Sequence, residues 1–218
     1  STTGKPDSTG SVGTAVEGAI KEVSELLDKL VTAVKTAEGA SSGTDAIGEV
    51  VDNDAKVADK ASVTGIAKGI KEIVEAARGS EKLKVAAAKE GNEKAGKLFG
   101  KAGAGAHGDS EAASKAAGAV SAVSGEQILS AIVKAAAAGD QEGKKPEEAK
   151  NPIAAAIGEG NGDAEFNQDG MKKDDQIAAA IALRGMAKDG KFAVKSGGGE
   201  KGKAEGAIKG AAESAVRK

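Results

Sequence analysis

The chain has 218 residues with 31 basic and 33 acidic side chains, and this near balance gives no electrostatic case for binding nucleic acid or an anionic membrane. Its aromatic content is 1%, which removes the usual platforms for base stacking and the usual anchors of a tight protein interface. The absence of cysteine excludes disulfides, thiolate metal sites and cysteine nucleophiles.

Small side chains decide the expected fold class. The chain has 32 glycines and abundant alanine, so each helix buries little apolar area, and burial stabilises by roughly 25 cal/mol per Å². We therefore predict an all-α fold, an elongated assembly of Ala/Gly-rich helices with a thin core and polar connecting loops. Residues 1–13 are predicted to be a polar leader, and residues 14–218 a single helical domain.

The strongest helix signal comes first. Thr14 and Glu17 form a capping box, and Gly39 is the corresponding stop. Between them, apolar side chains recur at helical spacing: Val16, Ile20, Val23, Leu27, Leu30 and Val34. A short helix is predicted to follow over Asp45–Val51.

The middle of the chain predicts four helices of decreasing regularity. The first has Ser62 as its cap, ends at Gly79 and carries an apolar face of Ile66, Ile70, Ile73 and Val74. Weaker helices are predicted over Leu83–Lys89 and Glu93–Lys101, and Ser110 is predicted to cap an alanine-rich helix.

Capping signals also define the elements that follow. Ser124 and Gln127 form a second capping box, which starts a helix with Ile128, Ile132 and Val133 that ends at Gly139. Asn151-Pro152 is the preferred entry into a short helix over Ile153–Ile157.

The last third begins with a predicted loop over Gly158–Gly170. A helix over Lys172–Lys188 is then expected, with one face made by Ile177, Ala180, Ile181 and Arg184. After it come a short extended piece (Phe192–Val194), a flexible joint (Ser196–Gly199) and a final helix over Lys203–Arg217.

The pentapeptide Glu-Gly-Ala-Ile-Lys occurs twice, at Glu17–Lys21 and Glu205–Lys209. Identical segments around a chemically bland interior suggest a cassette that is exchanged as a unit between two fixed ends. Each copy is equally explained as a piece of an apolar helix face, and alone the pair does not decide between these interpretations.

Residues with catalytic or ligand-binding chemistry are few. Gly91–Leu98 resembles a phosphate-binding loop, but Leu98 replaces the hydroxyl that ligates magnesium, and the preceding segment is predicted to be helical where the motif needs a strand. His107 is the sole histidine, with Asp109 nearby to orient it, and cannot supply a multi-histidine metal site. The acidic segments 52–54 and 160–163 lack the ligand spacing of a calcium loop. We therefore expect no enzyme activity, no cofactor and no metal.

One long segment carries a family resemblance. Residues Met171–Lys195, MKKDDQIAAAIALRGMAKDGKFAVK, resemble the near-constant segment of the spirochaetal variable major-protein-like surface lipoproteins. Four further segments resemble the framework of that family: Ile66–Ala77, Lys97–Gly103, Gly108–Lys134 and Glu205–Lys218. The resemblance extends over essentially the whole chain.

The resemblance implies an outer-surface antigen that evades the immune response by recombination of a central cassette, whose ends match the two pentapeptides. It implies host antibodies as partners, and attachment to the bacterial outer membrane through a lipid on a cysteine that is not among these residues. Variable stretches would fall at 40–60, 90–93, 136–143, 158–170 and 196–203. Because the family is longer, and because the sequence stops inside a helical pattern, we expect a fragment truncated at both ends.

Two groups of residues follow from this interpretation. The framework core is predicted to contain Ile20, Leu27, Ile70, Ile73, Ile132, Ile177 and Ile181. The constant antigenic segment is represented by Met171, Lys172, Lys173, Phe192 and Lys195, and we expect its Ile177/Ala180/Ile181 face to be buried.

Two alternatives stay open. The chain would instead be an adhesin if lysine-bearing faces bound a host ligand such as a glycosaminoglycan, against which the near-zero net charge argues weakly. A weak homodimer is also left open.

Overall fold

The computed structural model describes residues 16–18, 20–21, 24, 48–52, 57–77, 85–100, 107–139, 141–160, 164–197 and 199–217. The helices in this part of the chain are α2 (Lys60–Ala77), η2 (Glu93–Leu98), α3 (Ser110–Ser121), α4 (Gly125–Ala137), α5 (Pro152–Ile157), η3 (Asp169–Met171), α6 (Asp174–Met186) and α7 (Glu200–Arg217). Two-residue strands β1 (Val50–Val51) and β2 (Phe192–Ala193) are the only strands among the described residues. The predicted all-α class is confirmed.

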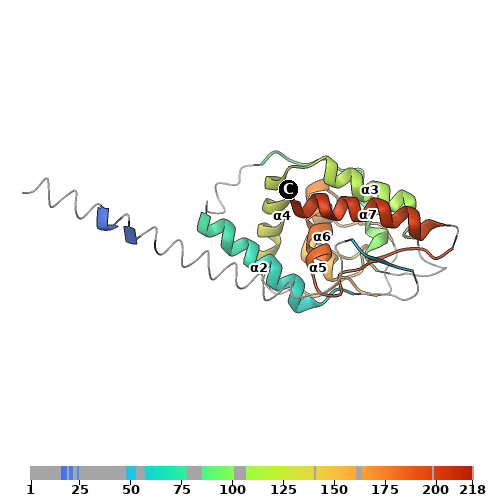
Figure 1. Cartoon of the computed structure of the whole chain (residues 1–218), viewed down its shortest axis with the longest axis horizontal. Helices are drawn as coiled ribbons and strands as arrows, with labels where there is room; N and C mark the ends of the chain where they lie inside the picture. The colour runs from blue at the N-terminus through green and yellow to red at the C-terminus, as the bar shows by residue number, and fades with distance from the viewer. Residues whose placement is uncertain are drawn as a thin grey trace, which may run out of the picture.

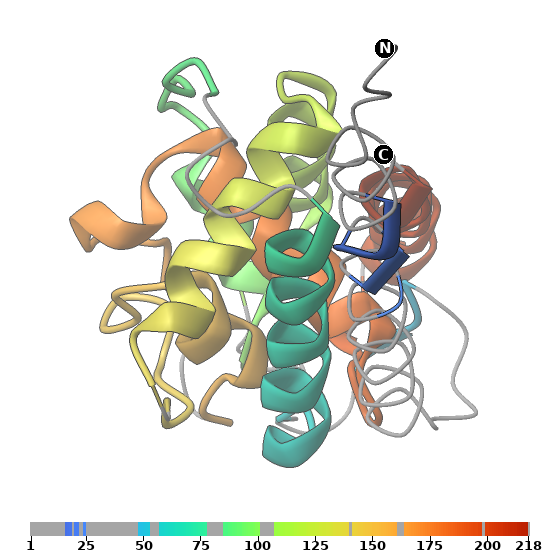
Figure 2. The ribbon, with the colours of Figure 1, turned by 90° about the vertical axis from the view of Figure 1, so that its left-hand side faces the viewer.

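Helix α6 lies at the centre of this arrangement (Figure 1) and contacts each of the helices α2, α3, α4, α5 and α7. Helices α3 and α7 run side by side on one flank. Figure 2 shows α2 and α4 next to each other at the opposite end of the body. Every described α-helix therefore packs, in part, on the same central helix.

Alanine is the commonest buried residue in the described part of the chain. In α6 the side chains of Ala178, Ala179 and Ala180 are fully buried between Ile177 and Ile181. Small side chains let neighbouring helices approach closely, so helix α6 can contact five others while each contact buries little area.

Helix starts follow capping chemistry, and two differ from the prediction. The Asp109 side chain accepts a hydrogen bond from the Ala112 amide (2.9 Å), and the Asp59 side chain accepts one from the Ser62 amide (2.7 Å). The predicted caps Ser110 and Ser62 are wrong, because an aspartate precedes each of them and caps at least as well.

Two other start signals are confirmed. Ser124 and Gln127 form a reciprocal capping box, with bonds of 3.2 Å and 2.8 Å. The Asn151 side chain accepts a bond from the Ala154 amide (2.9 Å), and Pro152 opens α5. These two signals involve only neighbouring residues, so the local sequence determines them.

Two predicted helices are wrong because long-range pairing takes their place. Instead of the helix over Asp45–Val51, strand β1 pairs in parallel with β2, with Val50 opposite Phe192; residues 45–47 lie outside the described part. In the predicted helix Leu83–Lys89, residues 85–89 have no regular secondary structure, and the Lys89 carbonyl accepts a hydrogen bond from the backbone N–H of Asp174 (2.8 Å).

The remaining differences are shifts of helix ends. Helix α6 spans Asp174–Met186 within the predicted Lys172–Lys188, and α7 starts at Glu200 instead of Lys203. The helix predicted from Glu93 is a short 3₁₀-helix. Most of the first predicted helix lies outside the described residues, but its described members are helical: Val16, Glu17, Gly18, Ile20, Lys21 and Ser24.

Candidate functional site

The side chain of Arg184 on α6 is fully buried in the middle of the fold. Its Nε donates to the Lys191 carbonyl (2.8 Å), and its Nη1 donates to the carbonyls of Ala156 (2.9 Å) and Ile157 (3.3 Å). The last two carbonyls end α5, where the helix dipole is negative. Burial lowers the pKa of the guanidinium to about 10, so the group keeps its charge at neutral pH. We call these contacts the Arg184 network.

All three phenylalanines of the chain surround this network. The ring of Phe99 lies 5.2 Å from that of Phe166 and 5.6 Å from that of Phe192, centroid to centroid. The Arg184 guanidinium carbon lies 5.7 Å from the centre of the Phe99 ring, a cation–π contact. The three aromatic residues therefore lie in the core, where their contacts bring together segments that are distant in the sequence.

The Arg184 network also explains a glycine. Gly158 ends α5 with a φ of +75°, and a Cβ there would lie 2.7 Å from the Phe99 carbonyl oxygen and 2.9 Å from Arg184 Nη1. The backbone conformation and the space both require glycine.

Gly139, which follows the C-cap of α4, supplies a matched control. It has a φ of +85°, and nothing lies within 4 Å of the point that a Cβ would occupy there. Replacing Gly139 with Ala should cost about 1–2 kcal/mol from backbone strain alone. Replacing Gly158 with Ala should cost at least about 1–3 kcal/mol more, because its ψ of 175° lies in a region nearly restricted to glycine and because the methyl group overpacks the network. Urea unfolding of both variants measures this difference, and equal losses would contradict the proposed crowding.

Residues 85–92 form hydrogen bonds with the start of α6 and so hold it in place. Glu90 pairs with Lys173 in an isolated antiparallel bridge. The side-chain amide of Asn92 donates a hydrogen bond to the carboxylate of Asp174 (2.8 Å). Asp174 is only 3% exposed. Burial raises the pKa of Asp174, and the Asn92 bond opposes that rise. Sequence reasoning missed these residues, since nothing local links Asn92 to a helix 82 positions away.

The segment Met171–Lys195, called here the constant segment, lies mostly inside the protein. Met171, Phe192 and the Ile177/Ala180/Ile181 face are fully buried. Lys173 and Lys195 are exposed, and half-buried Lys172 lies 3.8 Å from Asp169. Solvent therefore reaches mainly the charged residues of this segment.

The predicted framework residues occupy three environments. Ile132, Ile177 and Ile181 are buried. Ile70 is half-buried and packs against the core, and Ile73 is also half-buried. Leu27 lies outside the described residues.

Ile20 does not belong to the core. Its side chain is 64% exposed, so its assignment was wrong. The helical spacing on which that assignment rested shows an apolar face but not what covers it. Ile208, its counterpart in the second pentapeptide, is fully buried on α7. The isoleucines of the two pentapeptides thus occupy different environments.

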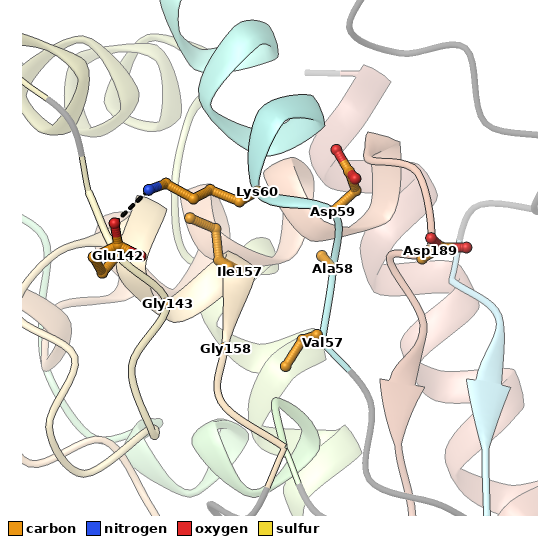
Figure 3. Close-up of a pocket in the computed structure, with 9 residues that line it drawn as sticks. All are labelled: Val57, Ala58, Asp59, Lys60, Glu142, Gly143, Ile157, Gly158 and Asp189. Atoms are coloured by element: carbon orange, nitrogen blue, oxygen red, sulfur yellow. Dashed lines mark hydrogen bonds and ion pairs between the residues drawn. The ribbon is translucent and has the colours of Figure 1, made fainter.

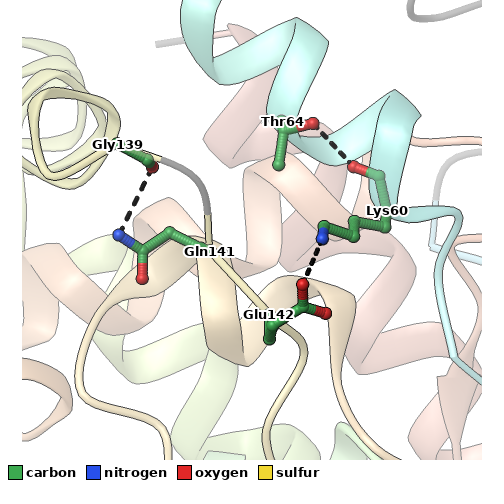
Figure 4. Close-up of polar contacts among 5 residues, drawn as sticks. All are labelled: Lys60, Thr64, Gly139, Gln141 and Glu142. Atoms are coloured by element: carbon green, nitrogen blue, oxygen red, sulfur yellow. Dashed lines mark hydrogen bonds and ion pairs between the residues drawn. The ribbon is translucent and has the colours of Figure 1, made fainter.

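A shallow surface depression of about 480 Å³ lies where four segments meet (Figure 3). It is lined by the residues leading into α2, by Glu142 and Gly143, by the end of α5 and by Asp189. Lys60 and Glu142 form an ion pair across it, and the Thr64 hydroxyl donates to the Lys60 carbonyl at 2.9 Å (Figure 4). Asp59 caps α2, so the main polar groups here have structural partners.

The sequence candidates for chemistry do not form a site. Gly96 packs against the backbone of Phe166, and Leu98 is fully buried, so Gly91–Leu98 forms no phosphate cradle. Residues 85–89, which precede this motif, are not helical, although we predicted a helix there. His107 is exposed, while Asp109 caps α3.

Metal and membrane features are also limited in the part of the chain that the structure describes. Within it, no group of three or more His, Asp or Glu residues could hold a metal ion. Asp52 lies 3.5 Å from Lys201, and residues 53–54 and 161–163 lie outside the described part. No single described helix is long and apolar enough to cross a membrane; α3 and α4 reach that length only as a pair bent by 102°.

The described part of the chain is thus a helical frame with buried supporting contacts and polar surface loops. The family model described as "Borrelia lipoprotein" matches residues 2–218. The chain therefore belongs to the Borrelia lipoprotein family, and the predicted family resemblance is confirmed.

Individual relatives agree with this assignment. The chain is 38% identical over 207 residues to variable large protein 4 of Borrelia hermsii, an alignment that covers 91% of this chain and 57% of that protein. It is 36% identical over 208 residues to variable large protein 17 of the same organism, with 93% and 58% covered. The chain thus spans a little over half the length of these curated relatives.

A solved structure matches the fold. The crystal structure of the Lyme disease variable surface antigen VlsE of Borrelia burgdorferi matches with a TM-score of 0.90 and 85% identity. The match covers 94% of this chain and 70% of that one. The chain thus has the fold of a variable surface antigen.

Burial of the constant segment predicts how antibodies reach it. Antibodies raised against the peptide Met171–Lys195 should bind the denatured protein much better than the native protein, because the Ile177/Ala180/Ile181 face is 0% exposed. Binding measured by surface plasmon resonance to native and to urea-denatured, captured chain tests this expectation. Equal binding to both forms would show that the segment is accessible in the native fold.

Proposed function

We propose that this chain is part of an outer-surface antigen that evades antibodies by varying its loops over a constant helical frame. The observation that carries the proposal is the likeness to VlsE, at 85% identity over 94% of the chain. The burial of the constant segment supports it, because a segment inside the core cannot change freely without loss of packing.

The proposed variation lies in a cassette whose ends are Glu17–Lys21 and Glu205–Lys209. Side chains in two of the expected variable stretches, 40–60 and 136–143, border the surface depression, among them Val57, which is 48% exposed. The side chains of Lys60 and Glu142 are 46% and 73% exposed. Substitutions and insertions in such loops cost little free energy, since loop-closure entropy grows slowly with length.

The proposed partners are host antibodies, which would meet these exposed stretches first. The proposed location is the bacterial outer membrane, with a lipid attached to a cysteine. These 218 residues contain no cysteine, so attachment would involve other parts of the protein.

The adhesin alternative has less support. A glycan-binding face needs lysines that are available to sulfate groups, whereas several described lysines lie beside carboxylates. The ion pairs include Lys71–Glu75 (3.0 Å), Lys94–Glu111 (2.8 Å) and Lys191–Glu49 (3.5 Å). We therefore favour the antigen.

Sequences of sibling clones from one infection test the proposal. Clones recovered from an immunocompetent host should differ mainly at exposed positions between the two pentapeptides, because selection by antibodies acts on surface residues. Buried residues such as Ile177 and Arg184 should stay unchanged. Clones from a host without antibodies supply the control. Changes spread evenly over buried and exposed positions, or equally outside the pentapeptides, would contradict the proposal.

A further inference from the structure

Helix α7 covers α3 and α6 with a face that holds a single large side chain. Its buried residues are Ala204, Ile208, Ala211, Ala212 and Ala215. The area that a methyl group buries is small, so this face of α7 buries little apolar area for a helix of its length.

Three glycines weaken the same helix from its outer face. Gly202, Gly206 and Gly210 are exposed, and nothing lies within 4 Å of a Cβ built on any of them. Gly118 of α3 differs, because its Cβ would lie 3.0 Å from Asn92 Oδ1. The α7 glycines therefore have no packing role, although each lowers helix stability between about two- and fivefold relative to alanine.

The connection into α7 and its outer contacts are also weak. Gly197 and Gly199 have φ values of +89° and +74° and open space at the Cβ position, which suits a pivot. Lys201 lies 3.5 Å from Asp52, both at the surface, where ion pairs contribute little. Gly48 lies against the backbone of Lys209. A Cβ atom built on Gly48 would lie 2.5 Å from the Cα of Lys209.

We infer that α7 detaches and unfolds locally, from Gly197 and Gly199 onward, while the rest of the fold stays closed. Regions with few buried apolar contacts open locally, at lower free energy than global unfolding. The Arg184 bonds to Ala156, Ile157 and Lys191 involve no residue of α7, and we expect them to be kept in the open form. Opening uncovers the face of α6 that α7 covers, and so gives transient access to part of the constant segment.

Thiol labelling tests this opening directly, since the chain has no cysteine of its own. Ala212→Cys places a thiol beneath α7, and Ala155→Cys places one in α5; both alanines are 0% exposed. Under native conditions the thiol at position 212 should react at least about tenfold faster than the thiol at 155, with little dependence on urea.

Two further variants separate local from global opening. Gly158→Ala destabilises the core, so it should speed labelling at 155 and leave labelling at 212 unchanged. The combined change Gly202→Ala, Gly206→Ala and Gly210→Ala should slow labelling at 212 by about ten- to a hundredfold.

Equal rates at 212 and 155, or an equal acceleration of both by Gly158→Ala, would overturn the inference. Hydrogen exchange of the unmodified chain gives an independent measurement if a cysteine variant fails to fold. Amides of α7 should then exchange faster than those of α4 and α6, and equal protection of the three helices would again overturn it.

Discussion

The buried charge of Arg184 is the constraint on which the rest of this structure depends. Moving a charged group into a protein interior is costly unless hydrogen bonds replace its water. Here the guanidinium reaches carbonyls at the end of α5 and before β2, and it lies over the Phe99 ring. All of these groups must be in place together, so the network fixes the relative positions of segments that are far apart in the sequence.

An alanine-rich core needs such a fixed point. Alanine contacts bring helices close together but do not distinguish strongly between alternative alignments, because small side chains interlock poorly. Three phenylalanines and one arginine provide the shape and the directed bonds that alanine lacks. The exposed ion pairs contribute little by comparison, so we expect their replacement to disturb the centre less than replacement of the capping residues.

Sequence alone predicted what depends on neighbouring residues. The capping box at Ser124 and Gln127 and the Asn151-Pro152 entry are local signals, and the structure contains them. The helix predicted over Leu83–Lys89 failed because its backbone bonds to the start of α6. Ile20 shows the same limit, since helical spacing indicates an apolar face but not whether anything covers it.

The candidate site was harder to predict than the fold. Helical spacing placed Arg184 on the same face as Ile177 and Ile181, and that position was the available signal of its burial. A charge on an apolar face is usually found at its edge, in contact with solvent. The acceptors that keep Arg184 inside are backbone carbonyls, which any sequence carries and which motif reasoning cannot detect.

The unfolding free energy of Arg184→Lys, compared with that of Arg217→Lys, tests this account most directly. Arg184 is fully buried, whereas Arg217 is exposed near the end of α7. A lysine ammonium lacks the planar fork that reaches acceptors on two sides. The account predicts a loss of about 3 kcal/mol or more at position 184 and a change within about 0.5 kcal/mol at position 217. A loss at 184 as small as that at 217 would contradict the central role of the buried guanidinium.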